Sequence, residues 1–390
     1  MFDSLRNNSK IVVYIVVAAF IVTGGLMGFG SYMSNNNSSS ASNSSSPYIA
    51  KVNDTGITPQ QYMNVLRNQA PQRQLSSSQI IPFRLNVLNS MIERQLILEQ
   101  ADEMDIKAQV TDKDVEEKIE GILKNNDLTR EELNNRLKDQ NSSLDQFKKD
   151  LKKSMETNNK IQQTVATTYN KVEVTEEEIK KEYEKSNKEK DLAQVKDELK
   201  KQILNDKQNK AFNNWLENVK AESNIAINDP TLNAYYQLNN KNYDQAISLF
   251  DNIIESNPSP MMYIYLAQAY EGKKNQEQVI ATYQQALEEY PDDWELYYNF
   301  GNYYRNMEEK EKALAKYDKA AANAGEDLMA HYKLYMVYSA LEAEDKAKTE
   351  MKKLTELQKK LQEQQQKKQS VEENNQQSQE NVQKGDKDEN

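Results

Sequence analysis

The sequence predicts an all-α protein with a single N-terminal transmembrane helix, a multi-helix domain and a helical-repeat α-solenoid. Three observations support this fold class. An uncharged apolar run covers residues 11–29, apolar residues recur at helical spacing through most of the chain that follows, and a repeat of about 34 residues occupies the C-terminal part. With 10 Gly and 8 Pro in 390 residues, the chain has few turn-forming residues for an all-β fold.

The composition excludes several kinds of chemistry. With 0 Cys and one histidine, His331, the chain forms no disulfides, thiolate zinc sites or Cys nucleophiles, and has no histidine pair. The net charge of −11 opposes binding to a phosphate backbone, so we expect no nucleic-acid partner. No carboxylate pair or calcium-binding loop stands out. We therefore expect no catalytic residues, no metal and no cofactor.

The N-terminal run has the features of a membrane anchor. It is long enough to cross a hydrocarbon core of about 30 Å, and Arg6 and Lys10 precede it, whereas no charge follows until Lys51. This asymmetry predicts a cytoplasmic N-terminus at 1–10, a transmembrane signal anchor at 11–31 and an extracytoplasmic remainder. The alternative is a cleaved signal peptide. Residues 32–48, rich in Asn and Ser, are expected to form a linker.

Helix-start signals and apolar stripes predict a compact helical domain over residues 49–228. Thr58 precedes Pro and is followed by Gln at the third helical position, as in a capping box. Thr129 and Thr175 are each followed by Glu three residues later, which predicts two further helix starts. Between these signals, apolar residues follow helical spacing, for example at Leu85, Leu88, Ile92, Leu96 and Ala101.

Several segments of this domain resemble a known family. The opening VNDTGIT (52–58) is similar to the strand-and-turn start of the SurA-type N-terminal chaperone domain, and VLNSMIERQLILEQADEMDI (87–106) resembles its long central helix. VTDKDVEEKIEGI, LTREELNNRL, SLDQFKKDL and KVEVTEEEIKKEYEKS follow in the family's order. The SurA, PpiD and PrsA types of exported foldase share this domain. The resemblance implies a SurA-N-like helical chaperone domain.

One departure from the family bears on enzymatic activity. In these foldases a parvulin prolyl-isomerase domain usually follows the segment matching residues 176–186. Here residues 188–190 lead directly into a segment, 191–227, that resembles the family's closing helix. Parvulin chemistry, as the family implies it, uses paired histidines around a Cys or Asp, which this chain lacks. We therefore expect a domain without the parvulin insert and no enzymatic activity.

The C-terminal repeat covers residues 229–354. Tyr270, Tyr304 and Tyr338 are spaced by one repeat length, and Ala313 and Ala347 follow the same step. The small and aromatic positions resemble those of tetratricopeptide repeats, which stack helix pairs into a curved solenoid. Of the 22 Tyr in the chain, 16 lie in this region, so repeat packing explains their abundance. Residues 355–390 are expected to extend the last helix to about Leu361 and then form a disordered polar tail.

The repeat register predicts a peptide-binding concave face on the first helix of each repeat. Side chains one or four residues from the packing positions are expected to face the concavity. This register selects Tyr235, Ile264, Gln268, Tyr298, Asn302, Arg305, Tyr332 and Met336. Such a mixed aromatic, amide and thioether surface suits an extended or helical peptide. The alternative is that several of these tyrosines pack between repeats.

Together, these features lead to one functional expectation and one alternative. The anchor run together with the two resemblances predicts a membrane-anchored, extracytoplasmic, non-catalytic chaperone in the cell membrane that binds unfolded or newly exported polypeptides. The alternative is a tetratricopeptide scaffold that assembles a cell-envelope or translocon-associated complex. In either case the partners are proteins, and the membrane is contacted through residues 11–31.

Overall fold

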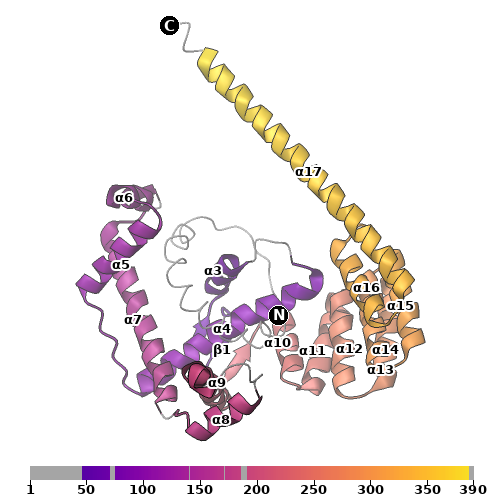
Figure 1. Cartoon of the computed structure of the whole chain (residues 1–390), viewed down its shortest axis with the longest axis horizontal. Coiled ribbons are helices and arrows are strands. Elements are labelled where there is room, and N and C mark those ends of the chain that lie inside the picture. The colour runs from indigo at the N-terminus through magenta and orange to yellow at the C-terminus, as the bar shows by residue number, and fades with distance from the viewer. Residues whose placement is uncertain (1–45, 71–74, 140, 171, 186–190, 386–390) are drawn as a thin grey trace. The chain divides into compact units, whose positions relative to one another are not determined.

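The computed structural model describes residues 46–70, 75–139, 141–170, 172–185 and 191–385 (Figure 1). Contacts divide the chain into two compact units, one containing Pro82–Leu232 and the other Leu75–Ile81 and Asn233–Asn390. Of the described residues, 46–70 also belong to the first unit. Within the described residues, no helix is both long and apolar enough to span a bilayer. The expected anchor at 11–31 lies outside these residues.

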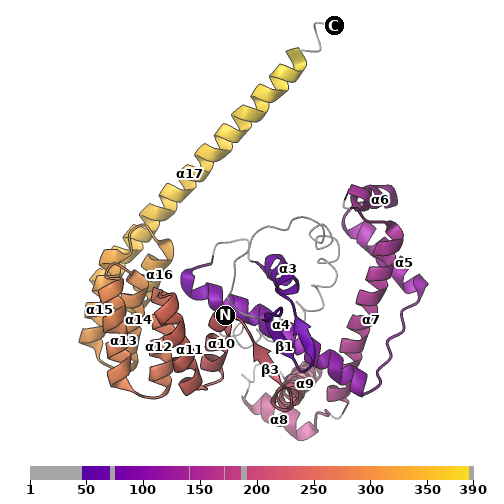
Figure 2. The ribbon, with the colours of Figure 1, turned by 180° about the vertical axis from the view of Figure 1, so that it is seen from behind.

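The first unit contains a small antiparallel sheet that the sequence only partly predicts. Strands β1 (Ala50–Val52), β2 (Thr55–Ile57) and β3 (Ile225–Ile227) are ordered β2-β1-β3, and Ala50 is paired with both Ile57 and Ile227. Figure 2 labels β1 and β3 of this sheet. The expected closing helix therefore ends earlier, at Glu222. The β-branched residues that follow it complete the sheet instead, because β1 offers them a pairing edge.

Helices α3 to α9 accompany the sheet, and several of their starts follow the capping signals of the sequence. Thr58 and Gln61 form a reciprocal capping box, as do Thr129 with Glu132 and Thr175 with Glu178. The helices are α3 (Pro59–Gln69), α4 (Ser77–Glu103), α5 (Asp112–Asn125), α6 (Arg130–Asp139), α7 (Leu144–Tyr169), α8 (Glu176–Lys185) and α9 (Leu192–Glu222).

Apolar clusters stabilise these helices. One cluster joins Ile97 of α4, Ile161 of α7 and Phe212 with Leu216 of α9. Another lies where α5, α6 and the start of α7 meet, and it consists of Val110, Val115, Ile119, Ile122, Leu123, Leu133, Leu137 and Phe147. The stripes predicted by helical spacing thus form the core of this unit.

The second unit is a stack of helix pairs. Its helices are α10 (Pro230–Asn239, from Asn233 onward), α11 (Tyr243–Ser256), α12 (Pro260–Gly272), α13 (Gln276–Glu289), α14 (Trp294–Asn306), α15 (Lys310–Asn323), α16 (Leu328–Ala340) and α17 (Glu344–Gly385). From α11 to α17, each helix contacts the one that follows it in the chain.

The same residues repeat the same structural roles along this stack. Gly301 allows close packing, because a Cβ there would lie 2.6 Å from the Tyr317 ring. The turns between the paired helices contain Lys274, Glu308 and Glu342, which are one repeat apart and all have a φ of 58° to 60°. Their left-handed backbone ends the first helix of each pair. The periodicity of the sequence is therefore a periodicity of helix pairs.

The C-terminal tail differs from its expected disorder. Helix α17 continues from Glu344 to Gly385 instead of ending near Leu361. Gln, Glu and Lys dominate this segment, and all three have high helix propensity. Ion pairs four residues apart, Lys352–Glu356 at 3.9 Å and Lys359–Glu363 at 4.0 Å, add to this local preference. A polar composition thus favours an extended helix here.

Candidate functional site

Helices α14 and α16 begin in the same way, which aligns their side chains. The Asp293 carboxylate accepts a hydrogen bond from the Leu296 amide at 2.8 Å. One repeat later, Asp327 accepts from the amides of Met329 (2.8 Å) and Ala330 (3.1 Å). Burial raises the pKa of Asp293. Because the two caps are one repeat apart, Glu295 and Met329 occupy equivalent positions, and so do Asn299 and Lys333.

The eight residues predicted from the register lie on the first helices of the four repeats. Tyr235 lies on α10, Ile264 and Gln268 on α12, Tyr298, Asn302 and Arg305 on α14, and Tyr332 and Met336 on α16. Burial separates them into two groups. The side chains on α10, α12 and α14 are buried or half-buried, whereas those on α16 are exposed.

The buried group packs within the repeats. Ile264 is only 2% exposed, so the expectation that it lines an open surface is wrong. The Tyr235 ring lies 4.6 Å from that of Tyr265, and the Asn302 side chain accepts a hydrogen bond of 2.9 Å from the Tyr317 hydroxyl. Burial raises the pKa of Tyr317 to about 12. These side chains hold neighbouring helices together, as the alternative interpretation of the tyrosines anticipates.

The two exposed residues form an apolar stripe along α16 together with Met329, which the register did not select. Met329, Tyr332 and Met336 are 37%, 51% and 49% exposed, and their spacing of three and four residues places them on one helical face. We call these three residues the α16 stripe. Clustered apolar side chains of this size on a surface are typical of interaction sites. Methionine adapts to partners of different shape because its side chain is flexible and polarisable.

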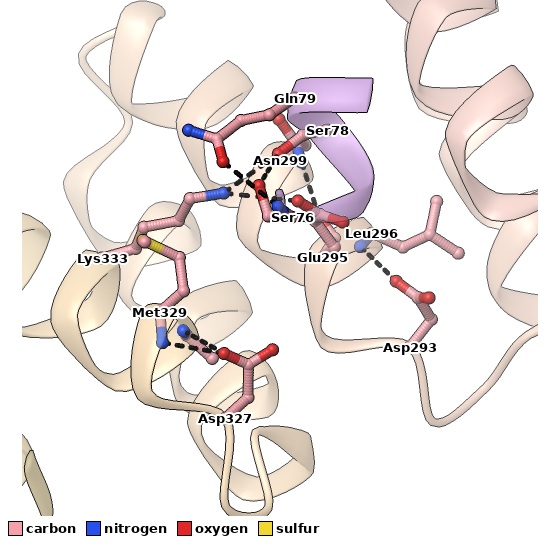
Figure 3. Close-up of polar contacts among 11 residues, drawn as sticks. Ser76, Ser78, Gln79, Asp293, Glu295, Leu296, Asn299, Asp327, Met329 and Lys333 are labelled. Atoms are coloured by element: carbon pink, nitrogen blue, oxygen red, sulfur yellow. Dashed lines mark hydrogen bonds and ion pairs between the residues drawn. The ribbon is translucent and has the colours of Figure 1, made fainter. Parts of the chain in front are cut away.

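A polar cluster beside the stripe centres on one ammonium group (Figure 3). Lys333 Nζ lies 3.3 Å from Glu295 Oε1 and donates a hydrogen bond of 3.3 Å to Ser78 Oγ. The same ammonium lies 5.3 Å from the Trp294 ring centroid and 5.5 Å from that of Tyr298, within the range of cation–π attraction. We call Trp294, Glu295, Tyr298 and Lys333 the Lys333 site.

Most of the Lys333 site was missed by the register analysis. Only Tyr298 was selected. Glu295 and Lys333 lie on the first helices of the third and fourth repeats. Their opposite charges on successive first helices were a signal that the sequence contained. By contrast, nothing in the local sequence of residues 75–81 indicates that Ser78 contacts the repeats.

The buried ionisable pair of His331 and Glu350 links elements of the repeat unit. His331 and Glu350 are both buried, and His331 Nδ1 lies 2.5 Å from Glu350 Oε2. The other ring nitrogen lies 2.9 Å from the Gly325 carbonyl, so the ring links α16, α17 and the loop before α16. Among the residues that the structure describes, no cluster of His, Cys, Asp and Glu has the arrangement of a metal site.

Comparisons with known families match parts of both units. Residues 1–162 match the family model described as a SurA-like N-terminal domain. Residues 231–293 and 282–315 match two tetratricopeptide repeat models. These domain types generally mediate protein–protein interaction, and neither is a catalytic domain. No curated protein matches the chain with significant similarity.

Proposed function

Because the chain has a SurA-like N-terminal domain followed by tetratricopeptide repeats, we propose that it is a non-catalytic chaperone for unfolded polypeptides. The α16 stripe is the observation that carries this proposal. Its three apolar side chains remain exposed on α16, the helix that also contains Lys333. Shallow contacts of this kind favour weak and broad binding, because ordering a flexible partner offsets much of the gain from buried area.

The proposal includes a location. Residues 11–31 anchor the chain in the cell membrane, and the positive charges before them keep the N-terminus in the cytoplasm. The two units then act outside the cytoplasm on newly exported polypeptides. Anchoring raises the local concentration of the binding surface near the membrane and partly compensates for weak contacts. A protease that digests the bulk of the chain in spheroplasts before lysis would support this orientation.

Suppression of client aggregation by the full chain tests the proposed activity. We expect Met329→Ser combined with Met336→Ser to weaken suppression strongly, because the stripe loses most of its apolar area. The matched control combines Met104→Ser and Met351→Ser, two similarly exposed methionines outside the stripe, the first just after α4 and the second on α17. Equal suppression by the two double variants would contradict a role for the stripe.

An assembly scaffold is the second candidate function, and the half-buried guanidinium of Arg305 among the register-selected side chains favours it. Directional charges and hydrogen bonds select one partner more sharply than apolar contacts do. In a scaffold, one cell-envelope or translocon-associated protein would dock on the concave face. Pull-down with Arg305→Ala, Tyr298→Ala and Tyr332→Ala variants separates the two functions. Loss of one dominant partner with intact client holding would support the scaffold.

A further inference from the structure

The segment Leu75–Ile81 belongs to the repeat unit, although it lies within the residues that match the SurA-like domain. It includes the first turn of α4, which begins at Ser77. Pro82 follows inside the helix and has no amide hydrogen, so the Ser78 carbonyl lacks its usual helical donor. The start of α4 is thus tied less firmly to the rest of its helix at the residue where the two units divide.

The segment contacts the Lys333 site through a serine hydroxyl. Ser78 Oγ accepts a hydrogen bond from Lys333 Nζ, and Ser76 Oγ lies 3.2 Å from Ser78 Oγ (Figure 3). The Ser76 amide donates to Gln79 Oε1 at 3.1 Å, which closes the turn on itself. Ser76 and Ser78 are half-buried, whereas Ser77 between them is exposed. Ser76 and Ser78 therefore face the repeat unit, and Ser77 faces solvent.

The segment also contains one buried apolar side chain. Ile81, three residues after Ser78 and on the same helical face, is 8% exposed, whereas its neighbour Ile80 is 45% exposed. The segment therefore presents one hydroxyl and one branched apolar side chain at a spacing of one helical turn. Because Leu75–Ile81 groups with the repeat unit, we take this pair as the pattern that the unit accepts around the Lys333 site.

The Lys333 site does not depend on the segment for its own charge balance. Glu295 Oε1 lies as close to the ammonium as the serine hydroxyl does, and two aromatic rings flank it. Withdrawal of Ser78 removes a neutral acceptor and leaves no unpaired buried charge. A contact of this kind is suited to exchange, because the site persists when its occupant leaves.

We propose that the Lys333 site recognises helix starts that present a hydroxyl residue followed three residues later by a branched apolar residue. The chain occupies the site with its own Leu75–Ile81, and an external polypeptide of the same pattern displaces this segment. The external partner rests on the proposed chaperone function. Client access to the concave face is thus in competition with the start of α4.

Thiol labelling of the full chain tests the occupancy. Because the sequence has 0 Cys, a single introduced thiol reports on one position. We expect a maleimide to label Ser78→Cys about tenfold more slowly than Ser77→Cys, and Lys333→Ala to remove most of this difference. Equal rates for the two single-cysteine variants would overturn the occupancy.

A peptide with the sequence of residues 75–90 tests the exchange. In excess, it should accelerate labelling of Ser78→Cys several-fold and leave Ser77→Cys unchanged. The control peptide has lysine in place of the residues corresponding to Ser78 and Ile81, and it should have no effect. Protection of Ser78→Cys that the matching peptide does not relieve would show a fixed structural contact and overturn the exchange. These rates do not involve client aggregation, so failure of the chaperone assay is seen separately.

Discussion

Helices α12 and α16 are the first helices of the second and fourth repeats, yet they differ in what they expose. Met261 and Ile264 of α12 are buried, whereas the equivalent residues of α16, Met329 and Tyr332, are exposed. The inner positions do not differ in this way, since Leu266 and Leu334 are both buried. Repeat register therefore determines which side chains pack between helices. The exposure of the concave positions depends on what covers them.

The Lys333 site lies at α14, the first helix of the third repeat, between α12 and α16 in the chain. It joins α14 to α16, and Ser78 covers part of it. Exposure at equivalent positions thus rises along the stack, because Ile264 of α12 is buried, Tyr298 of α14 is half-buried and Tyr332 of α16 is exposed. Four predictions test this gradient and the packing beneath it, beginning with the largest expected effect.

Removal of the His331 ring should loosen the open end of the stack most strongly. His331→Ala leaves the buried Glu350 carboxylate without its closest partner, and Lys353 Nζ, 3.8 Å from the other carboxylate oxygen, compensates weakly. We expect the free energy of unfolding to fall by about 3–5 kcal/mol, measured by urea unfolding. The exposed neighbour Tyr332→Ala is the control, with a change within about 0.5 kcal/mol. Equal midpoints for the two variants would be inconsistent with a buried pair.

Truncation at equivalent positions compares α12 with α16 directly. Ile264→Ala removes a buried side chain and should lower the free energy of unfolding by about 2–5 kcal/mol. Tyr332→Ala, two repeats later, should stay within about 0.5 kcal/mol because its side chain is exposed. Suppression of client aggregation should fall more in Tyr332→Ala than in Ile264→Ala. A small effect of Ile264→Ala on thermal unfolding would indicate that α12 is not covered.

A methyl group at Gly301 tests the packing of α14 against α15, the second helix of the same repeat. Gly301→Ala forces the Tyr317 ring to move and should lower the free energy of unfolding by about 1–3 kcal/mol. Gly121→Ala on α5 is the matched control, because a Cβ there meets no atom within 4 Å. That variant should be more stable by about 0.5–1 kcal/mol. Calorimetric melting of both variants checks the difference in sign.

The turn between α14 and α15 should give the smallest effect. Glu308 has a φ of 60°, a conformation that glycine adopts without the steric cost of a side chain. Glu308→Gly removes this steric cost, but it also gives the unfolded chain more conformational freedom. Together, the two effects should raise the free energy of unfolding by about 0.5 kcal/mol. Lys319→Gly, in the interior of α15, should lower it by about 1 kcal/mol. Denaturation midpoints that shift in the same direction would show that the turn is not strained.

Local signals in the sequence predicted local structure well. Thr58, Thr129 and Thr175 cap helices as their following Gln and Glu residues indicated. Long-range pairing was harder to predict. Strand β3 was interpreted as helix because Ile225–Ile227 follows a long helical pattern, and its partner β1 is far away in the sequence. The polar tail was expected to be disordered, since composition alone does not separate a solvated helix from a coil.

The predicted binding face shows the same division. The repeat period correctly located eight side chains on the first helices of the repeats, but it could not distinguish the buried Ile264 from the exposed Tyr332. Both residues have the same register and differ only in their surroundings. The period also contained the positions of Glu295 and Lys333, although their pairing depends on the distance between two helices.

By itself, the sequence determined the helix starts, the helix-pair repeat and the interior positions that hold the repeats together, because these depend on neighbours a few residues away or one repeat away. Tertiary structure alone decided which concave positions are covered and that Ser78 contacts Lys333. The physical reason is that periodicity specifies the direction of a side chain relative to its own helix. Whether that side chain meets solvent or another segment depends on parts of the chain that share no pattern with it.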